Sequence, residues 1–296
     1  MRFGRLTMAA VAALLTPCLA LAVDPPAATQ TPASAPTLTS ASTPTPAVPS
    51  VSTSDDRIAL SLNGSTLPRT NGGGGGSAAW LHNFDADTLA GAAIEHQVIS
   101  VSHWTFGSVN GALTRGSGDA RFSFYGEAHE GAGDDGPHPF KYAIEALGLI
   151  GTYFHRFSAQ LEDRQIEVEK THGNLPKVGV SYLWNPHVYT TVSYIHSVSG
   201  DLGTRLTSGR IDLYGPRLNY LAGISFGQAS PAILGSGFHV PGGGTLKEAY
   251  VGATKTFPHL RGDLSLVADY QDLSGSPRFA LTLNYIFHVG HNGKSQ

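Results

Sequence analysis

Residues 279 to 287 read Phe279-Ala-Leu-Thr-Leu-Asn-Tyr-Ile-Phe287 and alternate between two kinds of side chain. One face carries Phe279, Leu281, Leu283, Tyr285 and Phe287, and the other carries Ala280, Thr282 and Asn284. Because successive residues of a β-strand point to opposite sides, this stretch predicts a strand with one apolar wall and one small or polar wall. In a bacterial chain that also carries a secretory signal, an aromatic-terminated strand near the C-terminus is typical of the closing strand of an outer-membrane β-barrel.

The first 22 residues have the pattern of a signal peptide. Arg2 and Arg5 supply the positive charge, and Met8 to Leu15 form a short apolar core. Small residues then predict cleavage after Ala22. The apolar core is too short to span a bilayer as a helix.

The single cysteine of the chain, Cys18, lies inside this signal segment, so we expect no disulfide in the mature protein. A lipoprotein interpretation of Cys18 is the alternative. Pro17 argues against it, because lipobox processing requires a small residue directly before the cysteine.

Composition excludes some classes of function and leaves a barrel open. The formal net charge is −3 and only 14% of the residues are charged, below the usual quarter. No basic field is available for binding nucleic acid. The mean hydropathy of −0.06 argues against a helical membrane protein. It is compatible with a barrel, in which apolar and polar residues alternate and their contributions cancel.

Residues 23 to 56 form a distinct segment, dominated by Ala, Pro, Thr and Ser and without aromatic residues. Such a composition cannot bury enough apolar surface to offset the loss of chain entropy. We therefore expect a disordered, proline-rich periplasmic linker. A role in binding peptidoglycan or another periplasmic partner is the alternative, and the sequence does not separate the two.

From residue 57 to residue 287 the chain repeats a pattern of alternation, turn and alternation. Period-two stretches recur, for example, at residues 121–129, 177–184, 188–194, 218–227 and 260–270. This periodicity indicates strands, and no helical periodicity of comparable length competes with it. The sequence thus predicts an all-β fold, a transmembrane antiparallel up-and-down β-barrel over residues 57–287, followed by a short polar tail at residues 288–296.

Connection lengths suggest how many strands the barrel has. Short turns are expected at residues 85–86, 116–118, 155–156, 185–186, 215–216 and 258–259. Longer connections are expected at residues 131–139, 199–203 and 228–244, and a loop is expected through Gly72 to Gly76. If the first strand is Ser77 to Phe84, these connections separate thirteen strands. Counting Arg57 to Leu62 as an additional first strand gives an even number, and bacterial barrels have even numbers of strands. We expect about fourteen strands, with twelve as the fallback and a soluble β-sandwich as the structural alternative.

Charged residues on the polar faces of the strands are the candidate lining of the barrel interior. An Arg or Lys facing lipid at the bilayer midplane costs about 2–4 kcal/mol, so such residues are expected to face inward. The inward set is Arg121, Glu127, His129, Lys141, Glu145, Arg210, Asp212, Arg261, Asp263 and Asp269. Two interpretations stay open: a salt-bridge network that fills the interior, or a narrow polar conduit with charged constrictions.

No motif for catalysis, metal binding or a cofactor is recognisable. The 13 histidines include no HExxH or other zinc spacing. Ser102-His103 and His196-Ser197 place adjacent residues on opposite strand faces, so neither pair forms a nucleophile–base contact by itself. We therefore expect no catalytic residue, metal site or cofactor. A lipid hydrolase assembled across different strands is kept as an alternative.

The C-terminal region resembles a known family. The stretch from Leu206 to Arg217, the stretch Gly244 to Tyr250 and the closing Leu281 to Phe287 resemble the YaiO-type outer-membrane barrels, on strand spacing more than on distinctive motifs. The proline-rich extension and the tail after Phe287 depart from that pattern. This resemblance implies an outer-membrane protein without a known enzymatic centre.

Location, partners and function follow from the expected barrel. We expect the outer membrane of a Gram-negative bacterium, with its lipids and the barrel assembly machinery as partners, polysaccharide or peptidoglycan as candidate partners, and no nucleic acid. The predicted function is a narrow porin-like conduit, or a surface-glycan-associated barrel, for small polar or saccharide material. A non-conducting structural or adhesive barrel is the main alternative.

Overall fold

The computed structural model describes residues 55–66, 72–85, 87–99, 102–117, 119–135, 138–168, 171–200, 202–229 and 244–290. The predictions for the signal segment, for almost all of the proline-rich segment and for most of the tail lie outside these residues.

The described residues are almost entirely β-strand. The first half of the chain forms β1 (Asp55–Thr66), β2 (Gly73–Asn83), β3 (Thr88–Ile99), β4 (Ser102–Ser117), β5 (Ala120–Asp135), β6 (His138–Tyr153), β7 (Phe157–Val168) and β8 (Thr171–Asn174). The second half forms β9 (Lys177–Asn185), β10 (Val188–His196), β11 (Ser199–Gly200), β12 (Arg205–Leu213), β13 (Leu218–Ala229), β14 (Gly244–Phe257), β15 (Gly262–Leu273) and β16 (Ser276–Gly290). Within the described residues, no helix has the length and apolar character needed to span a bilayer.

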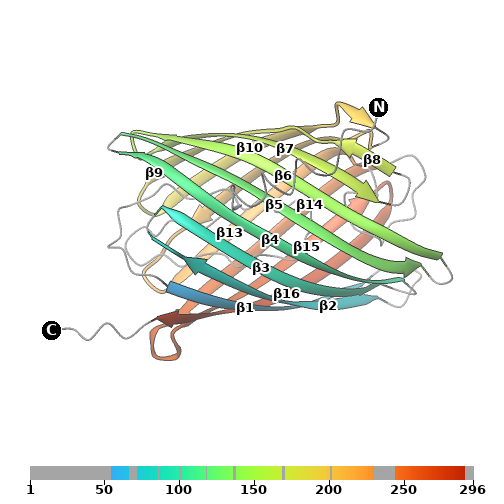
Figure 1. Ribbon diagram of the computed structural model, residues 1–296, viewed down its shortest axis with the longest axis horizontal. Coiled ribbons are helices and arrows are strands. Elements are labelled where there is room, and N and C mark those ends of the chain that lie inside the picture. The colour runs from blue at the N-terminus through green and yellow to red at the C-terminus, as the bar shows by residue number, and fades with distance from the viewer. Residues whose placement is uncertain are drawn as a thin grey trace.

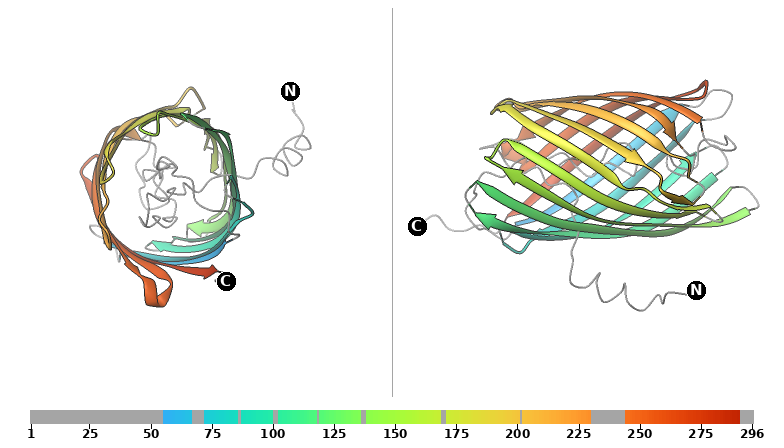
Figure 2. Two further views of the ribbon diagram at one scale, coloured as in Figure 1. Left: turned by 90° about the vertical axis from the view of Figure 1, so that its left-hand side faces the viewer. Right: turned by 90° about the horizontal axis from the view of Figure 1, so that it is seen from above.

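The strands close into a barrel (Figure 1; the end-on view of Figure 2 shows the closed ring). Each long strand pairs antiparallel with its neighbours, and the first strand, β1, pairs with the last, β16, from Asp55↔Gly290 to Thr66↔Phe279. The short β8 pairs with the last four residues of β7 on one side and with the short β11 on the other, while the preceding part of β7 pairs with β9. Fourteen strands therefore form the wall, which confirms the predicted fold and strand number.

Both ends of the barrel have short turns, but the longest connections all lie at one end. The end that holds the beginning of β1 and the end of β16 also has all six predicted short turns; we call it the short-turn end. The opposite loop end carries the β8 and β11 additions and the connection between Ala229 and Gly244.

Two glycine-containing segments that were predicted as loops belong to strands. β2 begins at Gly73, and β5 continues through Gly131 to Asp135. A Cβ at Gly75 would lie 2.5 Å from Gln97 Oε1, and a Cβ at Gly131 would lie 2.3 Å from Phe106 Cβ. These glycines leave room on the inner wall for side chains of the neighbouring strand. A glycine-rich composition alone does not distinguish such strand positions from a loop.

The barrel has an apolar exterior and a polar inner wall, as the alternation predicted. Leu266 is 47% exposed and Ile224 is 55% exposed, whereas the adjacent Ser265 and Ser225 are buried on the opposite face. Aromatic rings gather on the outside near the short turns, in the pairs Trp80–His82, Phe122–Tyr153 and Tyr182–Trp184. Amphipathic rings at this position are typical of a membrane interface.

Two of the apolar clusters on the inner wall lie toward the loop end. One cluster joins Ile144 and Ile166 on the wall to Leu175 and Leu202, which lie in the connections around β8 and β11. A second cluster consists of Leu206, Ala229, Leu246 and Leu273. Ile195 packs against both clusters, so the two form one apolar zone from β6 to β15. The polar groups described below lie next to this zone.

Candidate functional site

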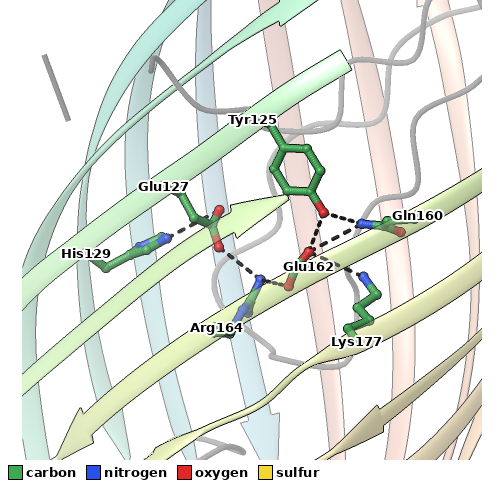
Figure 3. A network of polar contacts seen from close by, with 7 residues as sticks. All are labelled: Tyr125, Glu127, His129, Gln160, Glu162, Arg164 and Lys177. Carbon is green, nitrogen blue, oxygen red and sulfur yellow. Dashed lines mark hydrogen bonds and ion pairs between the residues drawn. The ribbon is translucent and has the colours of Figure 1, made fainter. Parts of the chain in front are cut away.

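A polar network links three strands on the inner wall (Figure 3). Strand β5 contributes Tyr125, Glu127 and His129, strand β7 contributes Gln160, Glu162 and Arg164, and strand β9 contributes Lys177. We call these seven residues the β5–β9 network.

Arg164 is the central cation of this network. Its Nη2 lies 3.0 Å from Glu127 Oε1 and 3.0 Å from Glu162 Oε1. Lys177 Nζ lies 3.8 Å from Glu162 Oε2, and the Tyr125 hydroxyl donates a 2.6 Å hydrogen bond to the same oxygen. Each full charge in the network therefore has an ion-pair partner, as a buried charge requires.

Small residues on β6 permit these contacts. Tyr125, Gly148, Glu162 and Lys177 are register partners in successive strands, so β6 separates the tyrosine from the glutamate. A Cβ at Gly148 would lie 2.2 Å from Tyr125 Cζ, which shows that the tyrosine ring lies directly over this glycine. In the adjacent row, Ala146 leaves room between Glu127 and Arg164. The network thus depends on residues without large side chains.

The same arrangement recurs on the other half of the barrel. Tyr250 on β14 lies over Gly223 on β13, where a Cβ would be 2.3 Å from its Cζ. The next strand, β12, carries Arg210, the register partner of Gly223, and Asp212. Arg210 Nε donates to both carboxylate oxygens of Asp212, at 2.9 and 3.0 Å.

On the inner wall, pairs of hydroxyl groups join the two strands of five hairpins, namely β4–β5, β6–β7, β9–β10, β12–β13 and β14–β15. They are Thr114–Ser123, Thr152–Ser158, Ser181–Thr191, Ser208–Ser225 and Thr254–Ser265, with oxygen–oxygen distances of 2.6 to 3.1 Å. A hydroxyl pair shares one hydrogen between two oxygens and leaves the second hydrogen for another acceptor. These pairs give the short-turn half of the wall a neutral hydrogen-bonding surface.

A third polar group lies on β14, β15 and β16, near the loop end. Gln271 donates a 2.9 Å hydrogen bond to Glu248 Oε1, and Gln271 is also the register partner of Arg278. Asp269 precedes Gln271 by two residues and so lies on the same face. We call Glu248, Asp269, Gln271 and Arg278 the β14–β16 cluster.

Many polar atoms of the inner wall have no hydrogen-bond partner among the described residues. They include Asn110 Oδ1, Gln160 Oε1, Glu248 Oε2, Asp269 Oδ1, Gln271 Oε1 and both amide atoms of Asn284. Buried polar atoms are almost always paired with protein or with water. Their number indicates an interior that offers hydrogen bonds to whatever occupies it.

Seven of the ten predicted lining residues lie on the inner wall: Arg121, Glu127, His129, Arg210, Asp212, Asp263 and Asp269. The structure brings Glu127 and His129 together in one network and Arg210 and Asp212 together in another. Asp263 instead contacts His288, at 2.8 Å from its Nε2, and Arg121 contacts Asp87, at 2.8 Å.

The other three assignments require correction. Lys141 and Glu145 share a face of β6 with the 47%-exposed Leu147 and are themselves exposed, so they point outward. They lie toward the loop end of β6, beside the exposed Asp163 and Glu167 of β7, where polar side chains can face water. Arg261 is exposed in the turn before β15 and has a positive φ of 48°, so it is not part of the wall.

The inner residues of β7 were not predicted. Residues 161–170 are polar on both faces, so alternation did not reveal that Gln160, Glu162 and Arg164 are inward. The signal in the sequence was their i, i+2 spacing, which continues the inward face from Ser158. The register of β7 against β6 is continuous from Phe157 to Val168, so the strand has no bulge over these residues.

The arrangement of the described side chains does not indicate a metal site. Within the described ranges, no group of three or more His, Cys, Asp or Glu residues is arranged to hold a metal ion.

Comparison with known proteins supports the fold. No protein-family model and no curated protein matches the chain. The CymD monoaromatic hydrocarbon channel gives a TM-score of 0.51 at 9% identity, over 82% of this chain and 90% of that chain. The KdgM porin in complex with disordered oligogalacturonate gives 0.44 at 9% identity over 77% and 98%. The outer membrane protein OprD from Pseudomonas aeruginosa gives 0.40 at 10% identity over 80% and 94%.

At such low identity, the likeness to CymD establishes the fold alone. A closed antiparallel barrel with an apolar exterior and a polar inner wall is the architecture of bacterial outer-membrane proteins. The chain is therefore an outer-membrane β-barrel.

Proposed function

We propose that this barrel is a narrow, porin-like conduit for small polar or saccharide solutes. One observation carries the proposal: the inner wall presents buried polar atoms that no described residue pairs by a hydrogen bond, while the outer wall is apolar. A barrel that only anchored itself in lipid would gain more stability from an apolar or fully hydrogen-bonded interior.

The wall supplies different chemistry in different sectors. Strands β1 and β2 turn small residues inward, among them Ala59, Ser61, Gly75 and Ser77, which leave room beside them. On the other side, the bulkier β5–β9 network narrows the interior and is held in place by its ion pairs. Solutes would pass beside the small-residue sector, in contact with the hydroxyl pairs.

We propose further properties of the barrel that concern transport, catalysis, family and partners. CymD is described as a channel, which supports solute passage through a barrel of this shape. We infer that the chain is not an enzyme, since its solved neighbours are channels and porins. Membership of the YaiO-type family rests on the strand spacing of the C-terminal stretch. The assembly machinery, polysaccharide and peptidoglycan are proposed partners on the basis of the fold and the proline-rich segment.

A swelling assay with proteoliposomes tests the conduit. Liposomes that contain the refolded full-length protein are diluted into isotonic solutions of neutral sugars of increasing size, and the control liposomes contain heat-unfolded protein. We expect swelling that slows as the sugar becomes larger, as a narrow polar pore requires. Equal rates in both preparations, with a correctly folded barrel, would contradict the conduit and favour a structural or adhesive barrel.

A further inference from the structure

The β14–β16 cluster differs from the β5–β9 network in how its charges are paired. Within the described part of the chain, no ion-pair contact within 4.0 Å involves Glu248, Asp269 or Arg278. Arg278 is close enough for electrostatic interaction with both carboxylates but does not contact either of them. The cluster therefore has a formal charge of −1 that no described neighbour neutralises.

Part of its hydrogen-bonding capacity is also unused, mostly on the acceptor side. Among the described residues, Glu248 Oε2 and Gln271 Oε1 have no hydrogen-bond partner, and the two side chains are 4% and 1% exposed. Asp269 Oδ1 is a third acceptor without a partner. Arg278 Nε is the one donor of the cluster that has no hydrogen-bond partner among the described residues.

Three free acceptors and a charge of −1 define the ligand that would complement the cluster. A primary ammonium group has three N–H donors and a charge of +1, in one compact centre. We propose that the β14–β16 cluster is a binding station for solutes that carry a primary ammonium group. The proposal deepens the conduit described above and rests on it for the route by which the solute arrives.

The place of the cluster suits this role. Gln271 and Arg278 pair two positions from Leu273↔Ser276, the last pair before the β15–β16 turn, so the station lies near the loop end. Leu246 and Leu273 of the apolar zone are on the same strands. A cationic solute would meet the acceptors near the outer mouth, before the hydroxyl pairs of the short-turn half.

Glucosamine and glucose are a matched pair of probes, because they differ in carrying an ammonium or a hydroxyl group on the same ring. We would measure equilibrium binding of each to the detergent-solubilised full-length barrel by saturation-transfer NMR at neutral pH. We expect glucosamine to bind at least about tenfold more tightly than glucose, the scale of a charge-assisted hydrogen bond. This measurement does not depend on conduction, so a barrel that binds glucosamine but passes no solute would overturn only the conduit.

Variants identify the site. The double variant Glu248→Gln/Asp269→Asn keeps the side-chain volumes and should abolish the preference for glucosamine. Arg278→Gln removes the only cation and should strengthen glucosamine binding. Glu167→Gln, an exposed carboxylate on the outer face of β7, is the matched control and should bind like the wild type. Equal binding of both sugars by the wild type, or an unchanged preference in the double variant, would overturn the proposal. Heat-modifiable migration on gels verifies that each variant is folded.

Discussion

The Tyr125 hydroxyl donates a 2.6 Å hydrogen bond to Glu162 across a complete intervening strand, and it reaches the glutamate because Gly148 has no side chain. A glycine with a tyrosine ring above it recurs at Gly223 and Tyr250, also next to a strand that carries an ion pair. Small residues on the inner wall are therefore part of the polar interior, since each allows a longer side chain to cross between strands.

Replacing Gly148 by Ala should disturb the β5–β9 network. The new Cβ overlaps the Tyr125 ring, so the hydroxyl loses its position on Glu162, at a cost of about 1–3 kcal/mol in unfolding free energy. Gly209→Ala is the matched control, because a Cβ there meets nothing within 4 Å. Urea titration of folding into lipid vesicles measures both variants. Equal stability of the two would contradict the role of Gly148.

The ion pairs of the network should be coupled. Glu162 lies between Arg164 and Lys177, so Glu162→Gln leaves two buried cations with one fewer carboxylate and should cost about 3–5 kcal/mol. Adding Lys177→Met should cost much less in the Glu162→Gln background than in the wild type. A double-mutant cycle by urea titration checks this, and strictly additive losses would show that the two residues do not interact.

Adjacent residues of β10 should differ in their tolerance of charge. Val192 is 53% exposed on the outer wall, and Ser193 faces inward. Val192→Arg should lower stability by about 2–4 kcal/mol and reduce assembly, because the charge faces lipid. Ser193→Arg should still assemble. Heat-modifiable gel migration of membrane fractions compares them, and the reverse order would refute the assignment of faces.

Removal of the closing strand should prevent insertion. Residues 279–287 pair with β1 on one side and with β15 on the other, so their deletion exposes two strand edges. Open edges carry unpaired backbone groups that hydrocarbon does not accommodate. Outer-membrane fractionation of the deletion variant should find no heat-modifiable barrel, and a barrel that still inserts would show that closure does not need this strand.

Much of this fold was predictable because alternation depends on the environment of each face, and that environment is uniform over most of the wall. Residues 279–287 and the pair Ser265–Leu266 follow the rule of alternation. The turn lengths, together with the even number of strands in bacterial barrels, led to fourteen strands.

The rule of alternation fails where the environment changes. Lys141 and Glu145 lie toward the loop end, where a polar residue can face outward, and residues 161–168 are polar on both sides. The contact between Tyr125 and Glu162 depends on register across three strands, which period-two patterns do not encode.

Single-channel recording in planar lipid bilayers tests the central claim most directly. The wild-type barrel, shown to be folded by its heat-modifiable migration, is added to a bilayer under applied voltage. The account predicts stepwise unitary currents, with an ion selectivity that shifts toward anions in Glu248→Gln/Asp269→Asn, because fixed negative charge near the mouth is removed. A folded and inserted wild-type barrel that gives no current would contradict the conduit.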